Sequence, residues 1–259
     1  MPFTFSHPAV VLPFRYIGKK YFSMTGLMIG SIIPDFEYFI RIQNRSHFSH
    51  TLPGIFWFDI PLGLFVCFLF HNIVKGPLIA NAPYSFHIRL IKYTHFDWNS
   101  YLKKNWVKVI YSLIIGILTH IISDKLTHKS SNFVSAVPGL LETQELIDTP
   151  KSIYRVIQIT FSIIGLALCA LTIWNFPTSR ITSDYNPNSR YWMIMSFIFT
   201  VTLTLILMKI GYEQADLIVS TMSALLTAVL ITSLISLPEK RMLLVRSSLN
   251  VRNDQPDNR

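Results

Sequence analysis

The sequence contains few charged residues. Asp, Glu, Lys and Arg together make up 14% of its 259 residues, whereas soluble domains usually carry about 25%. Hydrophobic residues make up 51%, and the mean hydropathy is +0.40. This composition argues against an ordinary soluble domain. Because the hydrophobic residues fall in long runs, the sequence predicts an all-α polytopic transmembrane helical bundle.

Cysteines and familiar catalytic motifs are also scarce. Cys67 and Cys169, the two cysteines, lie inside apolar runs, so they predict neither a disulfide framework nor a zinc-finger spacing. There is no Gly-rich phosphate loop, nucleophile elbow or His-Glu-x-x-His, which argues against nucleotide-driven and serine-hydrolase chemistry. No nucleic-acid motif accompanies the net charge of +9. We therefore expect membrane lipids, and not nucleic acid, as partners.

The apolar runs predict five full spans and a short N-terminal helical hairpin. The hairpin comprises a helix that Ser6 caps and that runs to about Arg15, and an apolar stretch at 22–33 that is too short to cross a bilayer. We expect a metal-site region at 1–150, a three-span scaffold at 151–240 and a disordered tail at 241–259. The full spans are predicted at 53–74, 107–124, 153–175, 191–210 and 217–237.

Basic residues predict the orientation of these spans. The connection at 75–106 and the tail are the richest in Lys and Arg, so we place both in the cytoplasm. The loops after Asp35 and after Asp124 then lie on the opposite side. The N-terminus lacks a charged segment and a cleavage site, and we expect it to be retained.

A metal-type pattern ends the second predicted span. His120, Asp124 and His128 are each four residues apart, so they share one face of a helix where it meets water. An ionisable pair at the edge of a membrane span indicates a functional site. His120 and Asp124 are therefore the strongest candidates for a functional site, and His128 is a neighbour with a plausible role.

Similar residue types stand at the edges of earlier apolar segments. His7 precedes the first helix, Asp35 and Glu37 follow Pro34, and His47 and His50 precede the first full span. Taken singly, His7 is equally consistent with a helix start and Asp35 is better explained as a turn residue. In an antiparallel hairpin, however, His7 and Asp35 come within reach of each other. Their convergence with the histidines would form a metal site.

Two ionisable residues lie inside or beyond the first span. Asp59 must face protein, water or a cation, and it either supports the metal site or binds an arginine. His71 lies far along the same helix from His50, so we expect it at the other membrane face.

With these residues in view, the chain resembles a family of bacterial membrane proteins designated domain of unknown function 4184. The resemblance is carried by Met-Pro-Phe-Thr-Phe-Ser-His at the N-terminus, by Gly-Ser-Ile-Ile-Pro-Asp at 30–35 and by Ser-His-Thr-Leu at 49–52. More distantly, the order of the His and Asp motifs is similar to the membrane-bound metal-dependent hydrolases and the zinc-dependent phospholipase C group. This likeness implies a bacterial cytoplasmic (inner) membrane location and a metal-ligand set of His7, Asp35, His50, His120 and Asp124.

The leading functional prediction is a metal-dependent hydrolase acting on a phosphoester or lipid-like substrate at the membrane surface. Zinc or another divalent metal would be its cofactor, and Glu37 or His128 would take the proton of the attacking water. One alternative is an ion- or proton-coupled transporter or channel-like protein that uses Asp59 and Asp124. The other is a non-catalytic membrane assembly or sensing protein in which these polar residues are structural.

Overall fold

A computed structural model describes residues 3–18, 20–43, 45–127, 143–146, 149–179, 185, 187–211 and 216–253. Among them, five helices are long and apolar enough to cross a membrane, which confirms the predicted all-α, multi-pass membrane protein. The chain forms two compact units, one from residues 1–67 and 98–175 and the other from residues 68–97 and 176–259. The five spans are Leu52–Ala80, Trp98–Leu126, Ile153–Trp174, Ser189–Ile210 and Leu217–Leu237.

The first unit begins with the predicted hairpin, built from shorter pieces than expected. Ser6 does not cap the first helix, because its hydroxyl donates to the Phe3 carbonyl at 2.6 Å. That helix is also interrupted at Leu12 and Pro13 before it resumes, since proline lacks the amide hydrogen that a continuous helix needs. The elements are η1 (Thr4–Ser6), α1 (Pro8–Val11), α2 (Phe14–Ile17), α3 (Met24–Gly30), η2 (Ile33–Asp35) and α4 (Phe36–Arg41).

Helix α3 packs closely against α9 (Trp98–Thr127) through glycines. A Cβ atom on Gly26 would lie 2.9 Å from the Cβ of Ser112, and one on Gly116 would lie 2.8 Å from the Ser31 nitrogen. Gly26 and Gly30 form a Gly-x-x-x-Gly motif, which allows two helix backbones to approach closely in a membrane. This close approach places the turn after α3 against the end of α9.

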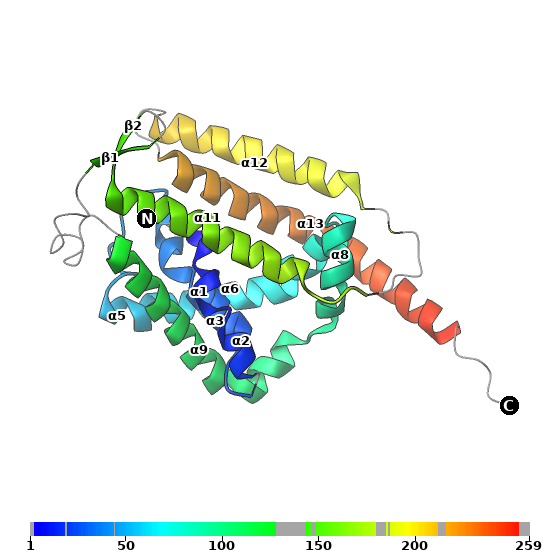
Figure 1. Ribbon diagram of the computed structural model, residues 1–259. Helices are drawn as coiled ribbons and strands as arrows, with labels where there is room; N and C mark the ends of the chain where they lie inside the picture. Colours follow the sequence, from blue (N-terminus) through cyan, green and yellow to red (C-terminus); the bar gives the residue numbers. More distant parts are fainter. Residues whose placement is uncertain are drawn as a thin grey trace. The chain divides into compact units, whose positions relative to one another are not determined.

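The rest of the first unit surrounds this pair. The segments α5 (Leu52–Gly54), the π-helix η3 (Ile55–Asp59) and α6 (Ile60–Leu69) follow one another, and Ile33, Ile55 and Ile117 form a buried cluster. The N-terminal segment is also tied to α11 (Ile153–Trp174), where Ser162 accepts a hydrogen bond from the Phe3 amide at 2.8 Å. Figure 1 shows α1 and α3 between α9 and α11. The strands β1 (Thr143–Leu146) and β2 (Thr149–Ser152) pair antiparallel before α11.

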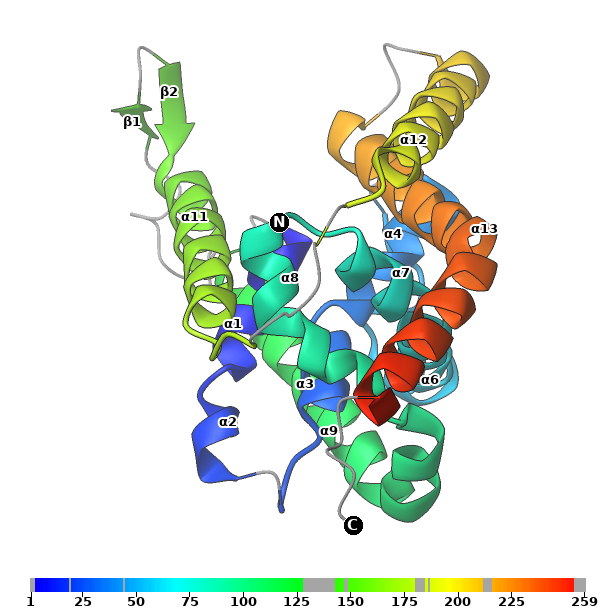
Figure 2. The same cartoon turned by 90° about the vertical axis from the view of Figure 1, so that its right-hand side faces the viewer.

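The second unit is organised around the neighbouring helices α12 (Ser189–Ile210) and α13 (Leu217–Asn253), seen side by side in Figure 2. The Trp192 indole donates to the Asn81 carbonyl at 2.8 Å, and the Tyr191 hydroxyl lies 3.4 Å from that of Ser233. The segments that precede these helices are the π-helix η4 (Phe70–Val74), α7 (Lys75–Ala80), α8 (Tyr84–Leu90) and η5 (Ile91–His95).

One predicted boundary, the start of the tail, differs from the structure, and the boundary near residue 150 is not tested by it. The tail predicted to be disordered from residue 241 is helical as far as Asn253, because it continues α13 with strong helix formers such as Met, Leu, Arg and Lys. The compact units also do not divide at residue 150, since α11 packs on η1 and α1 within the first unit. The expectation that the metal-site and scaffold regions meet near residue 150 remains a prediction.

Candidate metal centre

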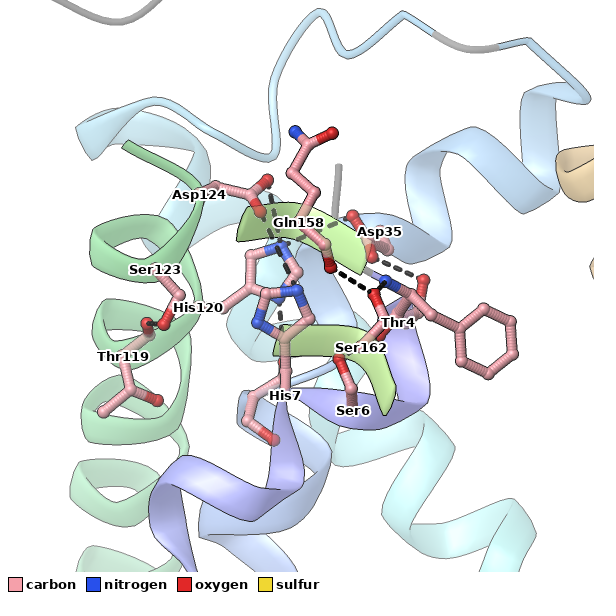
Figure 3. A network of polar contacts seen from close by, with 12 residues as sticks. Thr4, Ser6, His7, Asp35, Thr119, His120, Ser123, Asp124, Gln158 and Ser162 are labelled. Carbon is pink, nitrogen blue, oxygen red and sulfur yellow. Dashed lines mark hydrogen bonds and ion pairs between the residues drawn. The ribbon is translucent and has the colours of Figure 1, made fainter. Parts of the chain in front are cut away.

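The centre of the site is the pair His120 and Asp124 near the end of α9. The two side chains are buried on one helix face, with His120 Nε2 3.7 Å from Asp124 Oδ2. The same nitrogen lies 3.3 Å from Oδ1 of Asp35, which the hairpin brings to α9. Figure 3 shows these three side chains pointing toward one another. The fold therefore brings Asp35, from the N-terminal hairpin, to His120 and Asp124 near the end of α9.

Two further predicted residues join this cluster. His50, which precedes α5, has its Nε2 3.5 Å from Asp124 Oδ2, and His7 has its Nε2 3.7 Å from the other oxygen. The imidazole rings of His7 and His120 are 4.1 Å apart between centroids. One ligand-type atom from each of Asp35, His50, His120 and Asp124 lies within 4.8 Å of the others. All five residues predicted as metal ligands thus lie in one place.

The spacing of these atoms suits ligands of a common ion. Ligand atoms at the corners of a tetrahedral zinc site lie about 3.4 Å apart when the bonds are 2.0–2.1 Å. The distances from 3.3 to 3.7 Å are close to that value, but they are long for hydrogen bonds to a carboxylate. Within the part of the chain that the structure describes, His7 Nε2, Asp35 Oδ1, His50 Nε2 and His120 Nε2 are buried without a hydrogen-bond partner.

Surrounding polar groups orient the ligands. His120 Nδ1 lies 2.8 Å from the Ser31 carbonyl, and since a carbonyl only accepts, Nδ1 donates this bond and Nε2 is the ring nitrogen directed into the cluster. The Thr4 hydroxyl donates to Asp35 Oδ2 at 2.5 Å, which leaves Oδ1 for the centre. The Ser49 hydroxyl lies 2.9 Å from His50 Nδ1. Each of these three ligands therefore has one atom fixed by the protein and another directed into the cluster.

His7 is uncharged at neutral pH. Burial, and after it the neighbouring His120, lower the pKa of His7 from 6.5 to about 4, while Asp35 and Asp124 oppose this shift. A neutral imidazole is the form that binds metals. The electrostatics of the centre thus keep His7 in the form required of a ligand.

Glu37 has a different environment from the one predicted. Its carboxylate accepts hydrogen bonds from the backbone amides of residues 47, 48 and 49 at 2.8, 3.0 and 2.9 Å. Burial alone would raise the pKa of Glu37, but these bonds outweigh it and lower the pKa from 4.5 to about 2. A carboxylate so engaged is a weak base. This geometry argues against a proton-transfer role for Glu37, and His128 lies outside the described residues.

Sequence reasoning did not single out several residues that build the centre. The Tyr38 ring stacks on His50 with centroids 5.5 Å apart, and burial and Asp35 raise the pKa of its hydroxyl. Thr4 and Ser31 fix two of the ligands. The Gly-x-x-x-Gly spacing of α3 was the available signal for its close contact with α9. Thr4 lies within the N-terminal motif that carries the family resemblance, but that motif does not indicate its bond to Asp35.

Asp59 lies in the π-helix η3 with both carboxylate oxygens buried, and neither has a hydrogen-bond partner among the described residues. Replacing it with asparagine is expected to stabilise the protein by about 1 kcal/mol, because a buried carboxylate is more costly to desolvate than an amide. Thermal unfolding in detergent measures the change. A loss of stability of the same size would instead show that the carboxylate has a cationic partner.

The other histidines in the described part of the chain do not join the cluster as ligands. The His47 side chain is exposed, although its amide binds Glu37. His87, in the second unit, is buried with Nδ1 2.7 Å from the Ile79 carbonyl. His95 is exposed, and His71 contacts Phe70 and Phe96 within the second unit. These positions leave the five predicted residues as the histidines and aspartates of the centre.

Comparison with known families identifies the chain. The sequence pattern of the family described as domain of unknown function (DUF4184) matches residues 1–237. The chain belongs to this family. The matched region contains the whole cluster and ends with the fifth span. Comparison with curated proteins and with solved structures finds no match. The likeness to metal-dependent hydrolases and phospholipases therefore remains a prediction.

Proposed function

We propose that the protein is a metal-dependent hydrolase of the bacterial inner membrane that cleaves a phosphoester at the membrane surface. The observation that carries this proposal is the convergence of Asp35, His50, His120 and Asp124 from three separate segments, with ligand-type atoms within 4.8 Å of one another. Mixed histidine and carboxylate ligands are typical of catalytic zinc sites. Bound zinc would lower the pKa of a water molecule and offset charge on the phosphoester.

The residues of the chain have distinct parts in this proposal. His120 and His50 bind the ion through Nε2, and Asp35 binds it through the oxygen that Thr4 leaves available. Asp124 faces two histidines with one oxygen and His7 with the other. His7 would therefore bind either the same ion or a second ion bridged by this carboxylate. Metal stoichiometry distinguishes these arrangements. The proton-transfer role of His128 stands as a prediction.

The site lies close to one membrane face. Leu52 begins the first span just after His50, and the second span ends at Leu126 just after Asp124. At about 1.5 Å per residue, His120 lies about 9 Å along the helix from the end of its span. This depth matches the boundary between lipid head groups and hydrocarbon. The positive-inside rule assigns this face to the side opposite the cytoplasm.

Hydrolysis of bis(p-nitrophenyl) phosphate by the purified protein tests the proposal. Activity should disappear on chelation, return with zinc, and fall about 100-fold or more in Asp124→Asn, since this change weakens the shared ligand. His95→Ala, which alters an exposed histidine in the second unit, should leave activity unchanged. A protein that binds no divalent metal, or full activity in Asp124→Asn, would refute it.

A proton- or ion-coupled transporter is the second candidate, and Asp59 is the observation that favours it. A buried carboxylate without a hydrogen-bond partner inside a predicted span is a common feature of proton pathways. Flux in proteoliposomes that is lost in Asp59→Asn, without any hydrolytic turnover, would favour this function over the first.

A further inference from the structure

An apolar groove of about 390 Å³ runs between α1 and α11 in the first unit. Ala9 and Val10 form one wall, and one face of α11 from Val156 to Leu168 forms the other. Thr160 is the only polar side chain in this lining. The volume is in the range of small-molecule sites, about 300–1,000 Å³, and the lining suits a hydrocarbon ligand.

The groove has the position and length of a lipid chain. Helix α11 is a predicted membrane span, and side chains that line the groove, such as Ile164, are 53% exposed, so the face surrounding the groove meets hydrocarbon in the membrane. From Val156 to Leu168 the lining extends about 18 Å at about 1.5 Å per residue. One leaflet contributes about half of a hydrocarbon core about 30 Å thick. The groove therefore spans approximately one leaflet.

The groove adjoins the metal centre at Phe161. Phe161 lines the groove and its ring lies 6.0 Å from that of His7, between centroids. His7 directly precedes α1, whose residues Ala9 and Val10 line the groove. Since α11 begins at the membrane face where α9 ends, the groove passes the centre at Phe161 and continues along the span as far as Leu168. A charged cluster thus adjoins an apolar channel, as an amphiphilic ligand requires.

We propose that the groove binds one acyl chain of a membrane phospholipid and thereby holds its phosphate group at the metal centre. The acyl-chain site stands on the groove itself, whereas the identity of the lipid as substrate rests on the proposed hydrolase function. Phe161 separates the two parts of the ligand, with the chain on its groove side and the head group beside His7. The substrate class is accordingly a phospholipid, in preference to a water-soluble phosphoester.

Photolabelling tests this site without requiring turnover. The full-length protein is placed in phosphatidylethanolamine vesicles that contain phosphatidylglycerol with a diazirine in one acyl chain, and labelled residues are mapped by mass spectrometry. Label should concentrate on the groove-lining residues. Thr160→Phe should reduce this labelling about tenfold, because the added ring displaces methylene groups of the acyl chain from the groove. Ala9→Phe should do the same from the opposite wall.

Ile163→Phe is the matched control, because Ile163 is on the same helix, 63% exposed, and outside the groove lining. It should leave labelling unchanged. Even labelling around α11, or labelling unaffected by either groove variant in a folded protein, would overturn the acyl-chain site. Protein–protein cross-links formed by a photoreactive amino acid placed at Thr160 would assign the groove to a second copy and also overturn it.

The hydrolase assay separates this proposal from the function on which the substrate depends. Thr160→Phe should raise KM for long-chain phosphatidylglycerol about tenfold and leave KM for bis(p-nitrophenyl) phosphate unchanged. Groove labelling in a protein that neither binds metal nor turns over substrate would support the acyl-chain site and refute the hydrolase function. Equal effects on both substrates would instead refute a role for the groove in substrate binding.

Discussion

Replacing His120 with alanine is expected to abolish metal binding. His120 Nε2 lies close to both carboxylates, at 3.3 Å from Asp35 and 3.7 Å from Asp124, and its orientation is fixed by the bond to the Ser31 carbonyl. Loss of an outer hydrogen-bond partner typically weakens metal binding about 10- to 100-fold, so loss of a ligand should cost more than about 100-fold. Elemental analysis of protein purified in detergent measures bound metal directly.

His87→Ala is the matched control for this experiment. His87 is also a buried histidine whose Nδ1 donates to a backbone carbonyl, that of Ile79 at 2.7 Å, but it lies in the second unit. Its replacement removes a similar hydrogen bond and should leave metal content unchanged. Equal metal in the wild-type protein and in a folded His120→Ala variant would exclude His120 as a ligand.

Replacing Glu37 with alanine is expected to destabilise the protein by about 3 kcal/mol. Both carboxylate oxygens accept from three consecutive amides of the segment that leads to His50, and hydrogen bonds to a charged acceptor contribute about 1.5–3 kcal/mol each, less what water restores. Metal affinity should also fall, because the segment no longer holds His50 in place. Arg41→Ala is the control, since the Arg41–Glu37 pair at 3.9 Å is partly exposed and should contribute less than about 1 kcal/mol.

The contribution of Glu37 should depend on pH in a defined direction. The pKa of Glu37 is lowered in the folded protein, from 4.5 to about 2, so the folded state binds this proton less readily than the unfolded state. The stabilisation is therefore fully present above about pH 4.5 and is lost as the pH falls toward 2. The difference in melting temperature between wild type and Glu37→Gln should shrink over this interval. A constant difference would refute the carboxylate assignment.

Much of the membrane architecture could be predicted because hydropathy and length alone define a span. The last three predicted spans agree with the structure within about two residues. The second span begins at Trp98, earlier than predicted. Its first turns are amphipathic, so their mean hydropathy is too low to indicate a membrane span from the sequence. The hairpin could be predicted because the apolar pattern is interrupted at Gly18 and the second apolar stretch ends at Pro34. Its consequence, that His7 and Asp35 meet, followed from topology alone.

The internal support of the centre could not be predicted in the same way. Glu37 was assigned to proton transfer from its proximity in sequence to Asp35, but which amides a carboxylate binds depends on the path of the loop at 45–50. Similarly, the hydrogen bond from His120 to Ser31 requires the contact of α3 with α9. Such contacts depend on tertiary packing, which no local period in the sequence encodes.

The distribution of the ligands along the chain has a consequence for biogenesis. Asp35 and His50 are synthesised well before His120 and Asp124, and all four must reach the same face of the bilayer before an ion can bind. An α9 segment inserted in the reverse direction would leave its two ligands across the membrane from the others. On the proposed metal assignment, metal loading would therefore report on correct insertion, and a nascent chain that ends before Asp124 would not acquire the ion.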